Sequence, residues 1–275
     1  MKQEKLLKEL NLELFNEEQI VEIFKGLKKD LDVSIYAKIE FSDEQMKLIR
    51  EGLEKGLDVS VYANKDFRYE EMLEILLGLE KKLDVSIYAD PMLNYQQMEQ
   101  IRLGLEKGLD VSIYADSEYY PEQMRQIRLG LEKNLDVSVY SDFDFHYYKM
   151  EAIRRCLEKK LDFSVFLKQN FGSLELDVIM EGLKEDLDIS FYANSKFDWR
   201  QMNEIKDGLE KNLNVLLYAN SEFNKYQMIE IREGLEKNID VSIYAKPEID
   251  FNKMRIIKKS LIDLKKQKGN KRWII

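Results

Sequence analysis

Apolar residues between positions 41 and 66 recur at spacings of three, four and four, at Met46, Ile49, Leu53 and Leu57. This spacing places them on one face of an α-helix. Ser42 and Asp43 are favourable N-cap residues, and Gly56 can adopt the left-handed conformation that ends many helices. The pattern therefore predicts an α-helix from about residue 43 to 55.

The segment that follows has a different pattern. In "LDVSVYA", residues 57–63, apolar and polar positions alternate, as they do in a half-buried strand. The same letters also fit a short second helix of one to two turns that begins after Asp58 as N-cap. A strand would give an α/β solenoid, and a short helix would give an all-α one.

This pair of segments is repeated along the chain with a period of 26 residues and no insertion. The leucine before "DVS" recurs, with one isoleucine, at Leu31, Leu57, Leu83, Leu109, Leu135, Leu161, Leu187, Leu213 and Ile239. A fixed period of this length is typical of an array in which each copy packs on its neighbours. We expect a single repeat domain over residues 1–275, with an N-terminal cap at 1–14, repeats at 15–262 and a basic tail at 263–275.

The repeated pattern QM..IR.GLE.GLDVS.YA...F resembles helical repeats in proteins of Gram-positive bacteria, often on mobile elements. The resemblance covers residues 15–262, and related copies carry a longer second segment of the type S.EQV..YA. It implies that "DVSIYA" is a shortened second helix, and it implies no activity. We therefore predict an all-α, right-handed solenoid of nine to ten helix–short-helix repeats, with the α/β solenoid as the alternative.

Two columns of the repeat call for a packing explanation. A glycine such as Gly52 costs about 1 kcal/mol relative to alanine inside a helix, so this column indicates that another helix passes close by. Tyr62 and its equivalents are expected to pack with the hydroxyl in water. Cys156 stands in the glycine column, which favours a small structural residue over a catalytic thiol.

The composition narrows the class of protein. The chain is 44% hydrophobic and 35% charged, with no apolar run near the ~18 residues of a membrane span and no signal-peptide pattern. A single cysteine excludes an internal disulfide and favours a reducing, cytoplasmic setting. The net charge of −9 argues weakly against nucleic-acid binding. The basic end, interpreted as a solvated and frayed terminus, contains Lys265, Lys266, Lys268, Lys271 and Arg272.

Few residues suggest catalysis. His146 and Cys156 are each the only one of their kind, and no phosphate-binding loop or metal-ligand motif occurs. Asp58 and its equivalents could be N-caps or metal ligands. Adjacent helices lie ~8–10 Å apart, whereas a metal ion holds its oxygen ligands at ~2.0–2.6 Å, so carboxylates one repeat apart cannot share an ion. We therefore interpret these aspartates as N-caps. We expect no enzymatic activity, no cofactor and no metal.

Departures from the repeat are where a binding function is expected. A column predicted to face solvent holds charged residues in most repeats but leucine in three successive ones, at Leu77, Leu103 and Leu129, with Leu73 and Leu76 beside the first. These leucines predict an exposed apolar strip. The alternative is that leucine is simply a good helix former on a tolerant surface.

Extra aromatic residues form a second departure, in the segments that precede the long helices. They are Tyr95, Tyr120, Phe143, Tyr147, Tyr148 and Trp199. Aromatic residues at a loop edge are common anchors of protein interfaces. The alternative is that they close the hydrophobic end of each repeat.

Three functions follow as hypotheses. The first is a non-enzymatic protein-binding array. The resemblance extends this hypothesis: the chain would be an inhibitor or adaptor from a phage or mobile element that acts on a host defence protein. The second is a nucleic-acid-binding solenoid that uses the aromatic edge and an arginine column, Arg50, Arg102, Arg128, Arg154 and Arg232. The third is a self-assembling scaffold. The arginines discriminate between the first two, since they either line an uncovered face or pair with glutamates such as Glu54.

Overall fold

The structure, a computed structural model, describes residues 10–270, with side chains to residue 267. This part of the chain contains eleven α-helices and no strand, and consecutive helices pack in sequence order. The predicted all-α repeat solenoid is therefore confirmed over the α/β alternative. The chain divides into two compact units, 1–147 and 148–275, which are described separately. The single domain and the cap at 1–14 stay predictions, and residues 1–9 and 271–275 lie outside the described residues.

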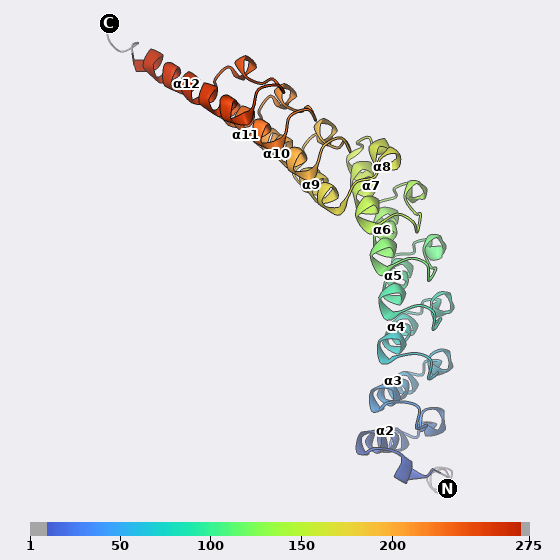
Figure 1. The fold of residues 1–275 in the computed structure, drawn as a ribbon. Helices are drawn as coiled ribbons and strands as arrows, with labels where there is room; N and C mark the ends of the chain where they lie inside the picture. Colours follow the sequence, from blue (N-terminus) through green and yellow to red (C-terminus); the bar gives the residue numbers. More distant parts are fainter. Residues whose placement is uncertain (1–9, 271–275) are drawn as a thin grey trace. The chain divides into compact units, whose positions relative to one another are not determined.

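Unit 1 has two layers (Figure 1). One layer is a stack of α-helices, each packed on the next: α2 (Glu17–Leu27), α3 (Asp43–Glu54), α4 (Tyr69–Glu80), α5 (Tyr95–Glu106) and α6 (Pro121–Glu132). The other layer consists of 3-10 turns, each packed on the α-helix before it: η2 (Val33–Ile35), η3 (Val59–Val61), η4 (Val85–Ile87), η5 (Val111–Ile113) and η6 (Val137–Val139). One more turn, η1 (Leu12–Leu14), precedes the stack.

Unit 2 repeats this arrangement with one irregular member (Figure 1). Its α-helices are α7 (Tyr147–Lys159), α8 (Ser164–Lys168), α9 (Ser173–Lys184), α10 (Trp199–Glu210), α11 (Lys225–Glu236) and α12 (Phe251–Asn270). Tyr147, the first residue of α7, is the last residue of unit 1. Its 3-10 turns are η7 (Ile189–Phe191), η8 (Val215–Leu217) and η9 (Val241–Ile243). The short α8 stands where a 3-10 turn is found in the other repeats. Helix α12 continues through residues 263–270, so this part of the basic end is helical where the sequence suggested a frayed terminus.

The ends of α3 follow from its sequence. Ser42 caps the first turn, because its Oγ accepts a hydrogen bond from the backbone N–H of Gln45, and the Gln45 side chain accepts one from the Ser42 N–H. At the other end Gly56 adopts a φ of 68°, which glycine reaches without strain. The N–H of Leu57 then returns to the carbonyl of Gly52. The predicted helix from residue 43 to 55 is thus confirmed to within one residue.

The short helix is a single 3-10 turn that begins after an aspartate. The Asp58 carboxylate accepts hydrogen bonds from the N–H of Ser60 at 3.1 Å and from its hydroxyl at 2.6 Å. These bonds hold the pKa of Asp58 below its usual range. The expected N-cap role is therefore confirmed. Val59 and Tyr62, three residues apart, are both buried, and Ser60 between them is exposed.

The glycine and tyrosine columns are two halves of one contact. A β-carbon added to Gly52 would overlap the Tyr62 hydroxyl and lie 2.7 Å from Val59 Cγ1. The expected close approach is real, but the group that needs the space is a side chain of the same repeat. The expectation of a solvated hydroxyl is wrong, because Tyr62 is fully buried and its hydroxyl donates to the Leu48 carbonyl at 3.0 Å. Six further tyrosines of this column make the same bond: Tyr36, Tyr88, Tyr114, Tyr140, Tyr218 and Tyr244.

Candidate partner-binding site

The arginine column lies between consecutive helices of the stack. In unit 1, Arg102 is 8% exposed, and its Nε donates to the Glu74 carboxylate of the preceding repeat at 2.6 Å. A second nitrogen of Arg102 pairs with Glu106 one turn away. Burial lowers the pKa of the Arg102 guanidinium, but the two carboxylates outweigh this effect and raise its pKa overall. The guanidinium is thus already satisfied, and it does not line an uncovered face.

Other repeats show the same bridge with small changes. The donor and acceptor are 28 residues apart in each, as in Arg50 to Glu22 at 2.7 Å, Arg128 to Gln100 at 3.1 Å and Arg232 to Glu204 at 2.9 Å. Arg154 is buried and pairs with Glu158. These pairings remove the main support for phosphate binding by this column, since a guanidinium that is paired inside the stack is not available to bind a phosphate.

Leu76 belongs to this buried arginine column and not to a surface strip. The positions equivalent to Glu74 and Arg102 in the preceding pair of repeats are Leu48 and Leu76, which are 3% and 2% exposed. An apolar pair thus replaces the ionic pair at one helix–helix contact. The prediction that Leu76 is available to a partner is therefore wrong, because the side chain fills the interface between two repeats.

The other predicted leucines are also more covered than expected. Leu73, Leu77, Leu103 and Leu129 are all half-buried. The column was predicted to face solvent from its angle to the apolar stripe, but neighbouring helices of the stack partly cover it. We find no open apolar strip along these leucines, and partner contact through them stays a prediction.

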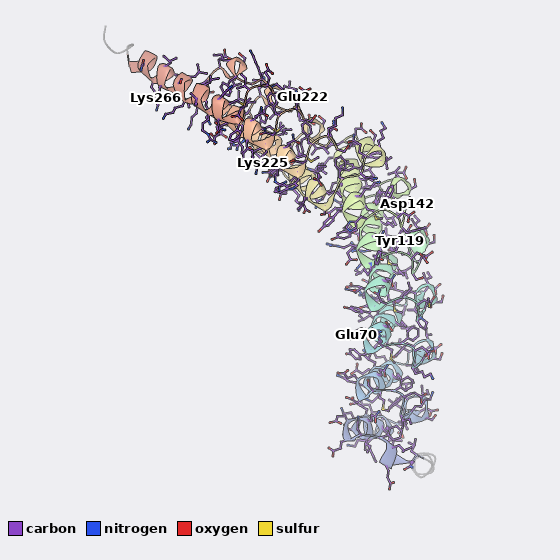
Figure 2. All side chains as sticks on the ribbon, in the orientation of Figure 1. Glu70, Tyr119, Asp142, Glu222, Lys225 and Lys266 are labelled. Atoms are coloured by element: carbon purple, nitrogen blue, oxygen red, sulfur yellow. The ribbon has the colours of Figure 1, made fainter. Side chains whose placement is uncertain are left out.

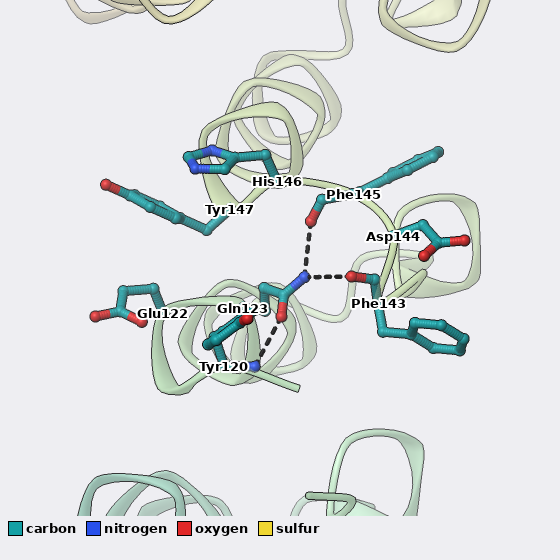
Figure 3. Close-up of a pocket in the computed structure, with 8 residues that line it drawn as sticks. All are labelled: Tyr120, Glu122, Gln123, Phe143, Asp144, Phe145, His146 and Tyr147. Atoms are coloured by element: carbon teal, nitrogen blue, oxygen red, sulfur yellow. Dashed lines mark hydrogen bonds between the residues drawn. The ribbon is translucent and has the colours of Figure 1, made fainter. Parts of the chain in front are cut away.

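Three of the predicted aromatic residues come together in unit 1. Tyr120, Phe143 and Tyr147 line a pocket of about 530 Å³ (Figure 3). The other lining residues are Glu122, Gln123, Asp144, Phe145 and His146. Tyr95 is exposed on α5 outside this pocket, and Tyr148 and Trp199 belong to unit 2.

The floor of the pocket is held by Gln123. Its side-chain amide donates to the carbonyls of Phe143 and Phe145, both at 2.8 Å, while its oxygen accepts from the N–H of Tyr120 at 2.7 Å. These bonds join the first turn of α6 to the loop of the next repeat. In Figure 3, Glu122 and Tyr147 point to one side of this amide, and Phe143 and Asp144 point to the other. The backbone of the pocket is therefore fixed, whereas the rings on it face outward.

The rings are unusually open for aromatic side chains. Tyr120 is 71% exposed and Phe143 is 54% exposed. Phe143 meets the buried Tyr119 edge to face at 6.4 Å, and the His146 ring lies 4.6 Å from that of Tyr147. Large exposed aromatic surface beside a fixed backbone is typical of an interface anchor.

The electrostatic environment of the pocket is acidic. Glu122 and Asp144 are the ionisable carboxylates among its lining residues, and none of these residues is a lysine or arginine. Next to the pocket, burial raises the pKa of Tyr119, and Asp142 and Asp116 raise it further. Tyr119 and Asp142 lie close together along unit 1 (Figure 2). The pocket is therefore suited to a group that carries positive charge.

Three exposed apolar residues on the consecutive turns η8 and η9 were not predicted from the sequence. In unit 2, Leu216 is 74% exposed, Leu217 is 38% exposed and Ile243 is 49% exposed. Leu216 replaces the serine of the "DVS" sequence, and Asn214 replaces its aspartate, so η8 has no side-chain cap. The signal was present, because this repeat alone departs from the pattern at both positions.

Groups with catalytic potential are scarce in the structure. Cys156 is fully buried, and burial raises the pKa of its thiol to about 12, so the reactive thiolate is absent near neutral pH. Over residues 10–270, no three His, Cys, Asp or Glu side chains gather as metal ligands would. Within the same range, none of the helices has the length and apolar character needed to cross a bilayer.

Comparison with known proteins identified no relative of this chain. The chain matches no family model, and neither the curated proteins nor the solved structures gave a match.

Proposed function

We propose that this chain is a protein-binding repeat protein and that the aromatic pocket of unit 1 is its docking site. The observation that carries the proposal is the gathering of Tyr120, Phe143 and Tyr147 around one fixed backbone, with Tyr120 71% exposed. The repeat itself does not need these rings. Its core is made by the methionine, isoleucine, valine and tyrosine columns, and aromatic residues left on the surface beside a rigid support are the usual anchors of binding.

The other two hypotheses have weaker support. Nucleic-acid binding relied on the arginine column, and those guanidinium groups are paired with carboxylates inside the stack. Self-assembly has no residue that favours it over binding of another protein. The extension to an inhibitor or adaptor from a phage or mobile element, acting in the cytoplasm on a host defence protein, rests on the sequence resemblance and the single cysteine alone.

A site-specific photo-crosslink tests the proposal. p-Benzoylphenylalanine at position 120 should capture a defined protein in cells of the source organism. The same group at Met92, which is 75% exposed on a loop of the same unit, should not capture that protein. The captured protein should then bind the purified chain, and Tyr120→Ser with Phe143→Ser should weaken binding by about thirtyfold, as expected for loss of a contact of about 2 kcal/mol.

The control is the fold of the double variant. Both side chains are exposed, and Tyr120 takes part in the pocket floor only through its backbone N–H. Circular dichroism and melting temperature should therefore stay close to those of the parent. A captured protein that binds the double variant as tightly as the parent would rule out this pocket as the docking site.

A further inference from the structure

We infer that the pocket receives a lysine or arginine side chain from a basic segment of the partner protein. The inference rests on the proposed function, because it names the chemistry of the partner at the same site. Its basis is the combination of open aromatic rings, carboxylates at both sides of the pocket and the absence of lysine or arginine among the lining residues.

The chain itself shows which groups such rings attract. In unit 2, the Arg200 guanidinium lies 4.5 Å from the centre of the Trp199 ring, and Lys225 Nζ lies 4.8 Å from that of Tyr226. Both rings stand in the first turn of a long helix, as Tyr120 stands directly before one. At these places an internal cation covers the aromatic face, which is the arrangement of a cation–π contact.

Two rings of the pocket in unit 1, Tyr120 and Phe143, are exposed in a similar way. The position equivalent to Arg200 is occupied by Glu122. Across residues 10–267, no lysine or arginine lies over the ring of Tyr120 or Phe143. The position equivalent to Trp199 holds Pro121, so Tyr120 is an additional ring, and Glu122 places a carboxylate in the pocket that this ring lines. A cation from outside the chain would satisfy both groups.

An apolar side chain fits the pocket less well. The carboxylates of Glu122 and Asp144 would lose water beside a group that cannot hydrogen-bond to them, and that loss is unfavourable. A guanidinium or ammonium group can contact a ring face with its stem and a carboxylate with its charged end. The net charge of −9 acts in the same direction, because it favours the approach of a basic segment.

Short peptides with one variable residue test this inference directly. The probes are glycine- and serine-rich pentapeptides with arginine, lysine, citrulline or norleucine at the centre. Binding is followed by NMR of the ¹³C-labelled aromatic rings, with the Tyr120 and Phe143 signals assigned from the two serine variants. We expect the arginine and lysine peptides to shift both signals, and the citrulline and norleucine peptides to bind at least about fivefold more weakly.

Matched variants separate local charge from net charge. Glu122→Gln and Glu118→Gln each remove one exposed carboxylate, but only Glu122 lines the pocket. Glu122→Gln should weaken the arginine peptide severalfold, and Glu118→Gln should leave its affinity nearly unchanged. Tyr120→Ser should weaken it by roughly five- to thirtyfold. The affinity should also fall as salt rises from about 50 to about 500 mM.

The outcomes distinguish this inference from the proposed function. Equal binding of the arginine and citrulline peptides would overturn it, because the charge would then not be recognised. Tetramethylammonium that bound as tightly as the arginine peptide would overturn the assignment to a protein segment. If no basic peptide shifts the rings while the crosslink at position 120 still captures a partner, the inference fails and the proposed function survives. If neither experiment succeeds, both fail.

Discussion

In unit 2, the hydroxyl of Tyr192 occupies the space in which a β-carbon on Gly182 would lie. Gly182 lies in α9, and Tyr192 directly follows the 3-10 turn η7 of the same repeat. Tyr192 is fully buried, and its hydroxyl has no hydrogen-bond partner, unlike those of seven other tyrosines in this column. The glycine is therefore kept for the space it leaves, and the hydroxyl that fills this space contributes little of its own.

Gly182→Ala should destabilise the protein by about 1–3 kcal/mol, the cost of overpacking a core. This loss should exceed the gain of about 1 kcal/mol that alanine brings to a helix interior. Tyr192→Phe should be nearly neutral, because it removes a hydroxyl without a partner. The double variant should recover part of the loss, because the overlap with the hydroxyl is removed, while the ring carbon Cζ at 3.1 Å remains and has to shift slightly.

Urea unfolding followed by circular dichroism measures this coupling. Asp177→Ala, an exposed change on the same helix, serves as control for helix propensity. Additive effects of Gly182→Ala and Tyr192→Phe would contradict a shared contact. The protein contains a natural version of the double change, since the repeat with Cys156 in the glycine column carries Phe166 in the tyrosine column, and both are fully buried.

These particulars show how far the sequence could be used. The apolar spacing of α3, its N-cap at Ser42 and its end at Gly56 each involve only residues close in sequence, so the bounds of this helix could be predicted to within one position. A three-residue 3-10 turn has no period of its own, so "DVS" resembled a strand. The tyrosine hydroxyl could not be placed, because its burial depends on a glycine ten residues earlier. The pocket was predicted as a group of aromatic residues, but the Gln123 bridge that fixes it was not.

The Arg102–Glu74 ion pair predicts the cost in stability of removing one or both of its partners. Arg102→Leu should cost about 2–4 kcal/mol, because Glu74 would keep a largely buried charge without its partner. The double variant Glu74→Leu with Arg102→Leu should recover most of this loss, since Leu48 and Leu76 already fill the equivalent positions. Urea unfolding of the two variants measures the difference. A double variant that is less stable than Arg102→Leu alone would show that the two columns are not exchangeable as a pair.

Glu106 and Glu74, which both contact Arg102, should change the stability of the fold with pH in opposite directions. Burial raises the pKa of Glu106, but Lys81 and Arg102 outweigh it, so its pKa is lowered overall. Its stabilisation is present above the ordinary glutamate pKa of about 4.3 and is lost as pH falls through the lowered value. Glu106→Gln should therefore be less stable than the parent at neutral pH, and the gap should close in acid.

Glu74 is the contrasting case. Burial raises its pKa above the usual range despite the contact with Arg102. Its favourable contribution is present below the ordinary pKa and is lost as pH rises through the raised value. Glu74→Gln should thus be well tolerated at neutral pH, as Gln100 is in the next repeat at 3.1 Å from Arg128. Relative to this variant, the parent should gain stability as pH falls. Parallel pH profiles for the two glutamine variants would contradict the assigned directions.

The uncapped turn η8 predicts a stabilising change. Asn214→Asp with Leu216→Ser restores the aspartate and serine found at η7, where the Asp188 carboxylate accepts a hydrogen bond from the Ser190 N–H at 3.0 Å. The restored cap should stabilise unit 2 by about 0.5–1 kcal/mol. It should also remove a leucine that is mostly in solvent, since Leu216 is 74% exposed.

The reverse exchange in the preceding repeat, Asp188→Asn with Ser190→Leu, is the matched control and should destabilise by a similar amount. Both variants are compared with the parent by urea unfolding at neutral pH. Changes in the free energy of unfolding that are opposite in sign and similar in size would show that η8 is less stable because it carries an exposed leucine in place of the cap. If the restored cap brings no gain while the control loses stability, then Leu216 stabilises the folded chain through contacts of its own.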